Sequence, residues 1–579
     1  MANGGFLRRF RWQILLAVVA VVAIGVLLWG QKPATAPNTV NSGPVPKRGG
    51  VYTEALIGHL SRLNPLLDGG NQVDRDVDRV LNCGLVRFDA RGLPQPSLAE
   101  SWGISADGAV YNFAIRKNAK WHDGKPVTAD DVLFTIELMR SDALPLPPAI
   151  RSLWKSVKVK KFNDYTFQIR LPEPYAPFLD YLTFGILPKH VWKDVPPSEI
   201  INSPKNLQPI GCGPYQFDSL VVKDGKITGV ALKAFKGYYE GHPFIERVVF
   251  RYYDTPKQAL QAYKDGEVLG IQRITNDILK PALAEPALNF YTARLPRMTL
   301  IYLNLGNQEV PFFKDKNVRK ALYLGLNRQW MIDHVLNGQA MIATGPIFPG
   351  TWAYYNKLKP IPYDPDRAIS ILKKDKFVIP AGGGDVREKD GKPLAFELVY
   401  PDDEVHAALA KEIQRDWSAL GVKATLKAVP YEKLITDYLE PRTYQAALVD
   451  IDLTRSPDPD PYPFWHQTQV TNGQNYAMWD NRRASEYLEQ ARITPDIIKR
   501  QKLYYNFQVI FEEELPALPL FYPVYTYAVD KRVGGVQLGP VFDISDRFNR
   551  INKWYLAVQA GGAKAQAGNT PASTGTPSP

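Results

Sequence analysis

The residue types that carry out most enzyme chemistry are present in this chain, but not in the spacings that such chemistry needs. Zinc proteases use His-Glu-x-x-His, serine hydrolases use Gly-x-Ser-x-Gly, and nucleotide loops use Gly-Lys followed by Ser or Thr. The sequence contains none of these patterns. No metal-ligand spacing links its seven histidines, which are His59, His122, His190, His242, His334, His406 and His466. We therefore expect neither catalytic residues nor a metal or cofactor.

Two further clusters have simple structural explanations. Asp130 and Asp131 could form a carboxylate pair, but they follow Thr128 at the predicted start of a helix, where acidic residues are favoured. Three glycines at 382–384 follow a proline and precede a charged stretch, so they predict a turn and not a phosphate-binding loop.

A polar and aromatic segment, LTRSPDPDPYPFW at 453–465, is the best candidate for a ligand site. It follows a unit that we interpret as strand, helix, strand, helix, strand, within residues 393–453. Such a unit forms a largely parallel sheet, and ligands bind beyond the carboxyl ends of its strands. The segment leaves the last of these strands, so we expect it to line a cleft.

Other elements are readable from local signals. Residues 110–116 alternate as a strand, and residues 128–140 have a capping box and helical apolar spacing. A helix should start at Thr255-Pro256, since threonine caps helices and proline suits the first turn. Residues 317–337 predict one long helix or two short ones, ended by Gly338.

Length and composition indicate an ordinary globular protein of more than one lobe. The chain has 579 residues, 45% of them hydrophobic, and a single core stops growing near roughly 300 residues. The net charge is +11, but Lys and Arg are interspersed with acids along the whole length. We interpret the excess as a solvated surface and expect no nucleic-acid partner.

The N-terminus predicts export. Basic residues within 1–11 precede an uncharged apolar run, which places the tip in the cytoplasm and residues 12–30 in the membrane. Pro37 directly follows the only small-x-small site, Ala34-Thr35-Ala36, so we favour an uncleaved signal-anchor over a cleaved signal. The protein should then lie on the outer face of the cytoplasmic membrane, in the periplasm, or be secreted if the signal is cleaved.

Two segments of biased composition flank the folded body. Residues 31–47 are a Pro-rich linker, and residues 560–579 are a low-complexity tail that we expect to be disordered. Cys83 and Cys212 are the only cysteines. In an exported chain they could form a bridge or remain two buried thiols.

Several long motifs resemble one family in the same order. The strongest is DGAVYNFAIRKNAKWHDGKPVTADDVLFTIELMRS at 107–141. Similar stretches are RGGVYTEALIGHLSRLNPL (48–66), LVRFD (85–89), PSLAESW (96–102), IGCGPYQF (210–217), PFFKDKNVRKALYLGLNR (311–328) and ELPALPLFYPVYTYAV (514–529). Together they resemble the family 5 extracellular solute-binding proteins of ABC transporters, the dipeptide, oligopeptide and nickel-binding class.

The resemblance implies an α/β, two-lobed periplasmic-binding-protein fold of the class II, or cluster C, type. Lobe I would span 48–285, with an extra subdomain at about 96–204, and would resume at 516–559, while lobe II would span 286–515. The protein would be a monomeric, extracytoplasmic component of an ABC importer. It would capture short peptides between its lobes and deliver them to permease subunits in the membrane.

The resemblance also suggests site residues. One wall would carry Thr53, Glu54 and Ala55 and the 211–214 turn with Cys212 and Gly213, and the other would carry Asn304, Trp352, Asp452, Thr454 and Arg455. Peptide-binding members commonly have an Asp where Arg455 stands here. An arginine favours a carboxylate, so we expect Arg455 to take one and Asp452 to take an amine or to balance Arg455. Cysteines at two family positions, 83 and 212, favour a bridge between them.

Other functions remain open at this point. An oligosaccharide could stack on Trp352 and Trp465, the chain could be an exported hydrolase, or it could be a receptor that senses its ligand without transport.

Overall fold

The computed structural model describes residues 46–557. The predicted cytoplasmic tip (1–11), signal-anchor (12–30), tail (560–579) and most of the linker (31–47) lie outside these residues. Within 46–557, no helix is both long and apolar enough to cross a membrane.

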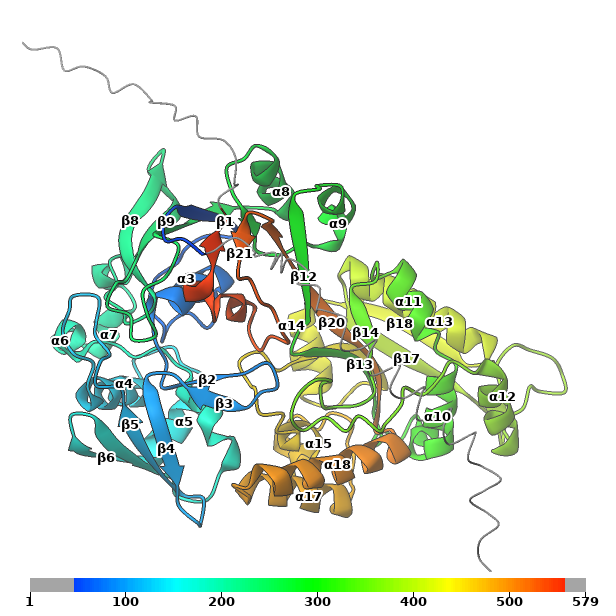
Figure 1. The fold of residues 1–579 in the computed structure, drawn as a ribbon. Coiled ribbons are helices and arrows are strands. Elements are labelled where there is room, and N and C mark those ends of the chain that lie inside the picture. The colour runs from blue at the N-terminus through cyan, green and yellow to red at the C-terminus, as the bar shows by residue number, and fades with distance from the viewer. Residues whose placement is uncertain (1–45, 558–579) are drawn as a thin grey trace, which may run out of the picture. The chain divides into compact units, whose positions relative to one another are not determined.

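Lobe I is built on parallel pairing at its centre. β1 (Val51–Ile57) pairs in parallel with β10 (Arg247–Tyr253) and β11 (Gly270–Ile271), and β9 (Lys226–Ala234) and β8 (Tyr215–Lys223) extend the sheet antiparallel (Figure 1). The helices of lobe I are α3 (Gln72–Leu81), α8 (Pro256–Lys264), α9 (Asn276–Leu283) and the short 3₁₀ helices η5 (Ile544–Phe548) and η6 (Ile551–Lys553). The helix predicted at Thr255-Pro256 is confirmed, with Thr255 and Gln258 forming a capping box.

The region near 96–204 has its own antiparallel sheet of four strands. Their order is β4 (Ala99–Ile104), β5 (Val110–Ile115), β7 (Thr166–Arg170) and β6 (Lys158–Asn163). Around it lie α4 (Ala129–Arg140), α5 (Pro148–Ser156), η1 (Ala176–Leu182), α6 (Lys189–Trp192), α7 (Pro197–Ile200) and η2 (Pro204–Leu207). The predicted strand at 110–116 and the capped helix at 128–140 are confirmed, since Thr128 and Asp131 form the expected capping box. We call this region the subdomain.

Lobe II contains the predicted strand–helix unit. β17 (Ala395–Pro401) pairs in parallel with β18 (Lys423–Val429) and β19 (Ala446–Asp452), and α13 (Glu404–Ala419) connects the first two strands. The second connection is α14 (Tyr431–Lys433), which continues as the π-helix η4 (Leu434–Leu439). The parallel arrangement predicted for 393–453 is therefore confirmed.

The other helices of lobe II surround this sheet. Residues 317–337 form two short helices, α10 (Lys316–Leu324) and α11 (Arg328–His334), because Asn327 caps the second with its side chain. The remaining helices are η3 (Pro311–Lys314), α12 (Pro365–Lys374), α15 (Tyr462–Trp465), α16 (Gln469–Asn472), α17 (Arg482–Ile493) and α18 (Ile497–Glu514). α11 ends at His334 with Val335 as its C-cap, so the helix stops earlier than predicted, and Gly338, with a φ of +74°, lies in the turn that follows.

One long strand, β20 (Ala517–Asp530), belongs to both lobes. Its first half pairs with β13 (Arg297–Leu303) and β14 (Ala340–Ile342), and its second half pairs with β12 (Leu288–Arg294). The chain therefore passes from lobe I to lobe II between β12 and β13. It returns to lobe I near Pro523, within β20. We had expected these two crossings after residues 285 and 515. β12 remains with lobe I because it pairs with the second half of β20 along its whole length.

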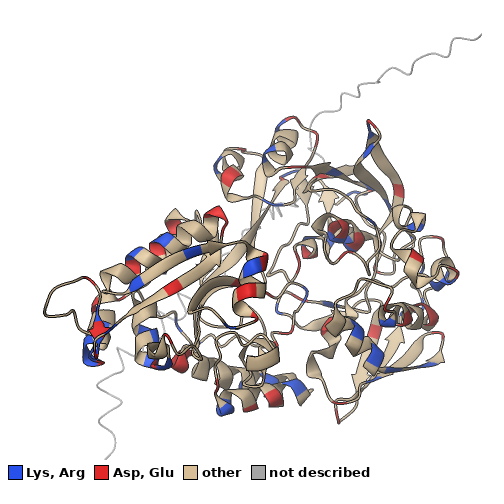
Figure 2. Cartoon of the chain, turned by 180° about the vertical axis from the view of Figure 1, so that it is seen from behind, with Lys and Arg blue, Asp and Glu red and all other residues tan. Residues whose placement is uncertain are grey.

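Charged residues of both signs are interspersed over the ribbon in the view of Figure 2. This distribution agrees with the interpretation of the net charge as a solvated surface.

Candidate functional site

A cavity of about 550 Å³ is bounded by three parts of the chain. Lobe I contributes the loop at 65–69, and lobe II contributes the loop after β19, at 452–464. The subdomain contributes the end of α4, the segment from Leu146 to Trp154, and residues 175–184 around η1. The cleft segment predicted at 453–465 is thus largely part of the lining. A cavity of this size suits a small organic ligand.

A second cavity, of about 590 Å³, lies between residues 87–95 and 537–553. β2 (Val86–Phe88) and β3 (Pro94–Pro96) provide part of its lining, and lobe II provides none. We take the first cavity as the candidate site because both lobes and the subdomain meet there.

Two backbone hydrogen bonds hold the lobe II loop, one beside the start of β13 and one across to lobe I. The Leu453 N–H donates to the carbonyl of Pro296, and the Arg455 N–H donates to the carbonyl of Phe542 over 2.7 Å. Arg455 has a φ of +68°, in the left-handed region that non-glycine residues rarely adopt. In this conformation the Arg455 side chain reaches Asp68 of lobe I.

Arg455 pairs with lobe I in this structure. Its Nη1 lies 2.8 Å from Oδ1 of Asp68, whose side chain is only 5% exposed. Burial raises the pKa of Asp68, and Arg455 opposes that rise. Burial would lower the pKa of Arg455, but the charges of Asp68 and Asp543 outweigh it and raise that pKa. The ion pair therefore joins the two lobes at the edge of the cavity.

Asp452 and Thr454 form a local cluster at the end of β19. Asp452 accepts from Arg297 over 2.6 Å and from the Thr454 N–H and hydroxyl over 2.8 and 2.6 Å. Burial alone would raise the pKa of Asp452, but these hydrogen bonds and the charge of Arg297 lower it. Asp452 and Arg455 both line the cavity, and each has a separate protein partner.

Two ion pairs, one buried and one half-buried, hold the proline-rich part of the loop. Arg500 of α18 pairs bidentately with Asp458, with N–O distances of 2.6 and 2.9 Å. Arg492 of α17 pairs with Asp460 at 2.8 Å. Asp458 and Asp460 lie within the predicted 453–465 segment, but sequence reasoning did not single them out, and it missed both arginines. The Asp-Pro repeat at 458–461 signalled the acids, whereas no local pattern links them to arginines more than thirty residues later.

Three predicted residues lie in β1, away from the cavity lining. Glu54 is fully buried and accepts from Tyr52, Tyr527 and the guanidinium of Arg547. Burial raises the pKa of Glu54, while Arg547 opposes that rise. Thr53 and Ala55, its neighbours on the strand, also do not line the cavity.

Asn304 and Trp352 are buried within lobe II. Asn304 donates to the backbone carbonyls of Arg442 and Tyr444, which is a structural role. Trp352 packs over Arg500, whose guanidinium carbon is 5.0 Å from its ring centroid. Neither residue lines the cavity, but Trp352 supports the arginine that holds Asp458.

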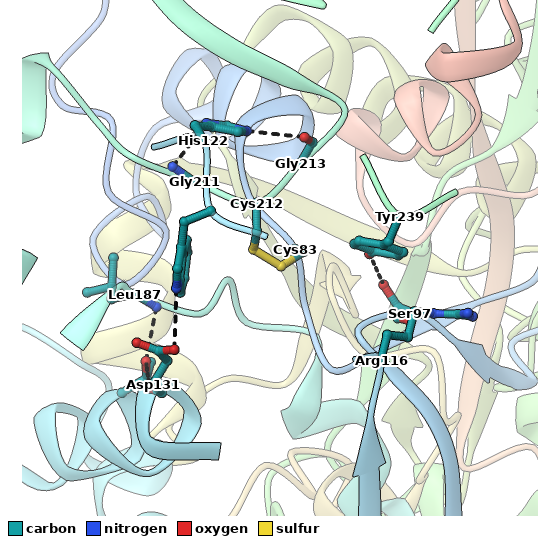
Figure 3. The surroundings of a disulfide bond; sticks show 12 residues. Cys83, Ser97, Arg116, His122, Asp131, Leu187, Gly211, Cys212, Gly213 and Tyr239 are labelled. Atoms are coloured by element: carbon teal, nitrogen blue, oxygen red, sulfur yellow. Dashed lines mark hydrogen bonds between the residues drawn. A yellow bond between two sulfur atoms is a disulfide. The ribbon is translucent and has the colours of Figure 1, made fainter. Parts of the chain in front are cut away.

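The 211–214 turn is attached to the end of α3 by a disulfide. Cys83 and Cys212 are bonded, with a Cα–Cα distance of 5.4 Å (Figure 3). Neither Cys212 nor Gly213 lines the 550 Å³ cavity. A Cβ at Gly211 or Gly213 would lie within 2.5 Å of a backbone carbonyl oxygen of α3, so both glycines permit this close approach.

His122 bridges the same turn. Its Nδ1 accepts from the Gly211 N–H, and its Nε2 lies 3.1 Å from the Gly213 carbonyl oxygen (Figure 3). A carbonyl needs a donor, so Nε2 carries the proton and the ring is neutral. Burial lowers the pKa of His122 to about 4.

Fold and cavity together define a two-lobed protein with a candidate ligand site between its lobes. Comparison with known proteins supplies the family. Residues 94–474 match the model described as "Bacterial extracellular solute-binding proteins, family 5 Middle". The match covers more than half of the chain, and the chain belongs to this family.

Named relatives extend the similarity over the whole body. The chain is 26% identical to the oligopeptide-binding protein AppA of Bacillus subtilis, over 95% of this chain and 99% of that protein. It is 28% identical to the dipeptide-binding protein of Escherichia coli, over 77% and 84% of the two chains. The solved structure of AppA with a nonapeptide superposes on this chain with a TM-score of 0.65. The match covers 89% of this chain and 100% of the AppA chain. The predicted family and two-lobed α/β fold are confirmed.

Proposed function

We propose that this protein is the extracytoplasmic substrate-binding component of an ABC importer and that it captures short peptides in the 550 Å³ cavity. The observation that carries the proposal is this partly enclosed cavity between the lobes, in a chain whose relatives are named for binding oligopeptides and dipeptides. With a peptide bound, the protein would present it to permease subunits in the membrane. We further propose that it acts as a monomer held to the membrane by residues 12–30.

The lining suits a peptide because it offers two kinds of contact. Apolar side chains such as Leu66, Trp154 and Phe464 can cover ligand side chains, and carboxylates and Arg455 can meet polar groups. Arg455 remains our candidate for a ligand carboxylate. To bind one, its guanidinium would have to share its donors with Asp68 or exchange that partner for the ligand.

The alternatives receive less support from this cavity. Trp352 and Trp465, proposed to stack on a sugar, are both buried in lobe II and do not line it. A hydrolase would need a base beside a nucleophile such as Ser456, and no histidine is among the described residues of the lining. We therefore also propose that the protein binds its ligand without converting it.

Native mass spectrometry of the protein as purified tests the proposal. We expect small molecules that dissociate from the protein and fragment as peptides. A variant with a blocked cavity, Gly69→Trp, should carry none, since residue 69 lines the cavity and a Cβ there meets no atom within 4 Å. The matched control is Gly103→Trp, which is equally open but lies on β4, away from the lining. Sugars in place of peptides, or equal peptide occupancy in both variants, would refute the proposal.

A further inference from the structure

Five carboxylates line the candidate cavity, and four of them have a guanidinium partner. The pairs are Asp68 with Arg455, Asp452 with Arg297, Asp458 with Arg500 and Asp460 with Arg492, at N–O distances of 2.6 to 2.8 Å. The fifth is Asp180, in the 3₁₀ helix η1 of the subdomain. No ion pair within residues 46–557 includes Asp180.

The contacts of Asp180 do not compensate its charge. Its Oδ2 accepts a hydrogen bond from the backbone N–H of Asp458 over 2.8 Å, and that is the only hydrogen bond of its carboxylate to the described residues. Its nearest charged neighbours include Asp458 and Asp460, which repel it, while Arg500 is already paired with Asp458. Burial and the charge of Asp458 raise the pKa of Asp180 well above its usual range.

The local charge balance shows what is missing. Three carboxylates, of Asp180, Asp458 and Asp460, face two guanidinium groups, of Arg492 and Arg500. When Asp180 is ionised, the wall of this partly enclosed cavity therefore carries one negative charge in excess. A buried charge is unfavourable unless it is paired, and a cation delivered by the ligand would pair it.

We propose that Asp180 binds the ammonium group of the ligand, which for a short peptide is its free N-terminus. This inference depends on the proposed function, because it assigns one end of the peptide to the subdomain. A primary ammonium fits because it is compact and has three donors, of which Asp180 can accept one or two. The amine end of the ligand would then lie against η1 and the 458–460 loop.

The test uses the full chain in mild detergent and peptides of two to five residues without Lys or Arg. Half of the peptide mixture is acetylated at its N-termini. Calorimetric titration of the wild-type chain should show free-amine peptides binding roughly 10- to 100-fold more tightly than acetylated ones, as for a hydrogen bond to a charged group. In Asp180→Asn this ratio should fall close to one, since the amide retains an acceptor for the Asp458 N–H but has no charge.

Asp194→Asn is the matched control. Asp194 is an exposed aspartate of the same subdomain outside the cavity lining, so this variant should keep the wild-type ratio. If Asp180→Asn does not fold, Asp180→Ser provides the same comparison. The preference of the wild-type chain for free-amine over acetylated peptides can be measured without any variant.

The outcomes separate this inference from the function on which it depends. Peptides that bind the wild-type chain equally with and without acetylation, or an unchanged ratio in Asp180→Asn, would overturn the role of Asp180 and leave peptide binding intact. If neither mixture binds the wild-type chain, the proposed function fails, and the role of Asp180 fails with it.

Discussion

Replacing Arg455 by methionine should weaken ligand binding by opening the lobes. The change keeps most of the apolar stem and removes the charge that pairs with Asp68 across the cavity at 2.8 Å. Because the lobe II loop and the 65–69 loop are joined by this pair, its loss should favour conformations in which the lobes are separated. A ligand that needs both walls would then bind a smaller population of competent molecules.

The size of the effect follows from opposing terms. Unit charges about 4 Å apart attract by about 4 kcal/mol at an effective dielectric constant of 20. Desolvation of Asp68 offsets much of this attraction, and the Arg455 side chain is still 36% exposed, which screens it further. We expect a net coupling of about 1 to 2 kcal/mol, which is roughly a 5- to 30-fold loss of affinity.

A double-mutant cycle with peptide titration measures the coupling. Arg455→Met and Asp68→Asn should each weaken peptide binding. The double variant should lose little more affinity than whichever single variant binds the peptide less tightly. Small-angle scattering without ligand should show a larger radius of gyration in all three. The matched control is Arg532→Met, which breaks an Arg–Asp pair with Asp530 inside lobe I, where Asp530 is also 5% exposed.

Two results would refute this reasoning. Strictly additive losses in the double variant would show that the two side chains act independently. An unchanged affinity and radius in Arg455→Met would show that the pair does not contribute to lobe closure.

Two further predictions concern stability. Replacing Cys83 and Cys212 by serine should lower the free energy of unfolding by about 3 to 5 kcal/mol in urea titrations, because the disulfide closes a loop with a sequence separation of 129. Peptide affinity should be unchanged, and a loss under about 1 kcal/mol would contradict the estimate. His122 has a folded pKa of about 4, so the unfolded chain binds the extra proton between about pH 6.5 and 4, and stability falls as the pH is lowered through that window. The wild-type chain should lose up to about 3 kcal/mol more than His122→Gln between pH 7 and 4, and equal losses would contradict this.

Short sequence patterns correctly predicted those helices and strands whose formation depends on residues close together in the chain. Thr128 with Asp131 and Thr255 with Gln258 form capping boxes because both partners lie within one helical turn. The alternation of strands and helices at 393–453 predicted a parallel unit, and with it the position of the 453–465 loop at the end of a strand.

The site itself depended on contacts between distant residues. Asp180 lies in an apolar stretch with no polar pattern, and only the fold shows that its neighbours Asp458 and Asp460 have arginine partners while it has none. Glu54 was expected at the ligand wall from the family resemblance. Its buried pairing with Arg547, almost five hundred residues later, could not be read from β1 alone.

A crystal structure of the chain with the peptide that it retains would test the central claim most directly. We predict density for the peptide in the 550 Å³ cavity, between the 65–69 loop, η1 and the 452–464 loop, with its amine at Asp180. Density in the 590 Å³ cavity beside residues 537–553, with the first cavity empty, would contradict the account.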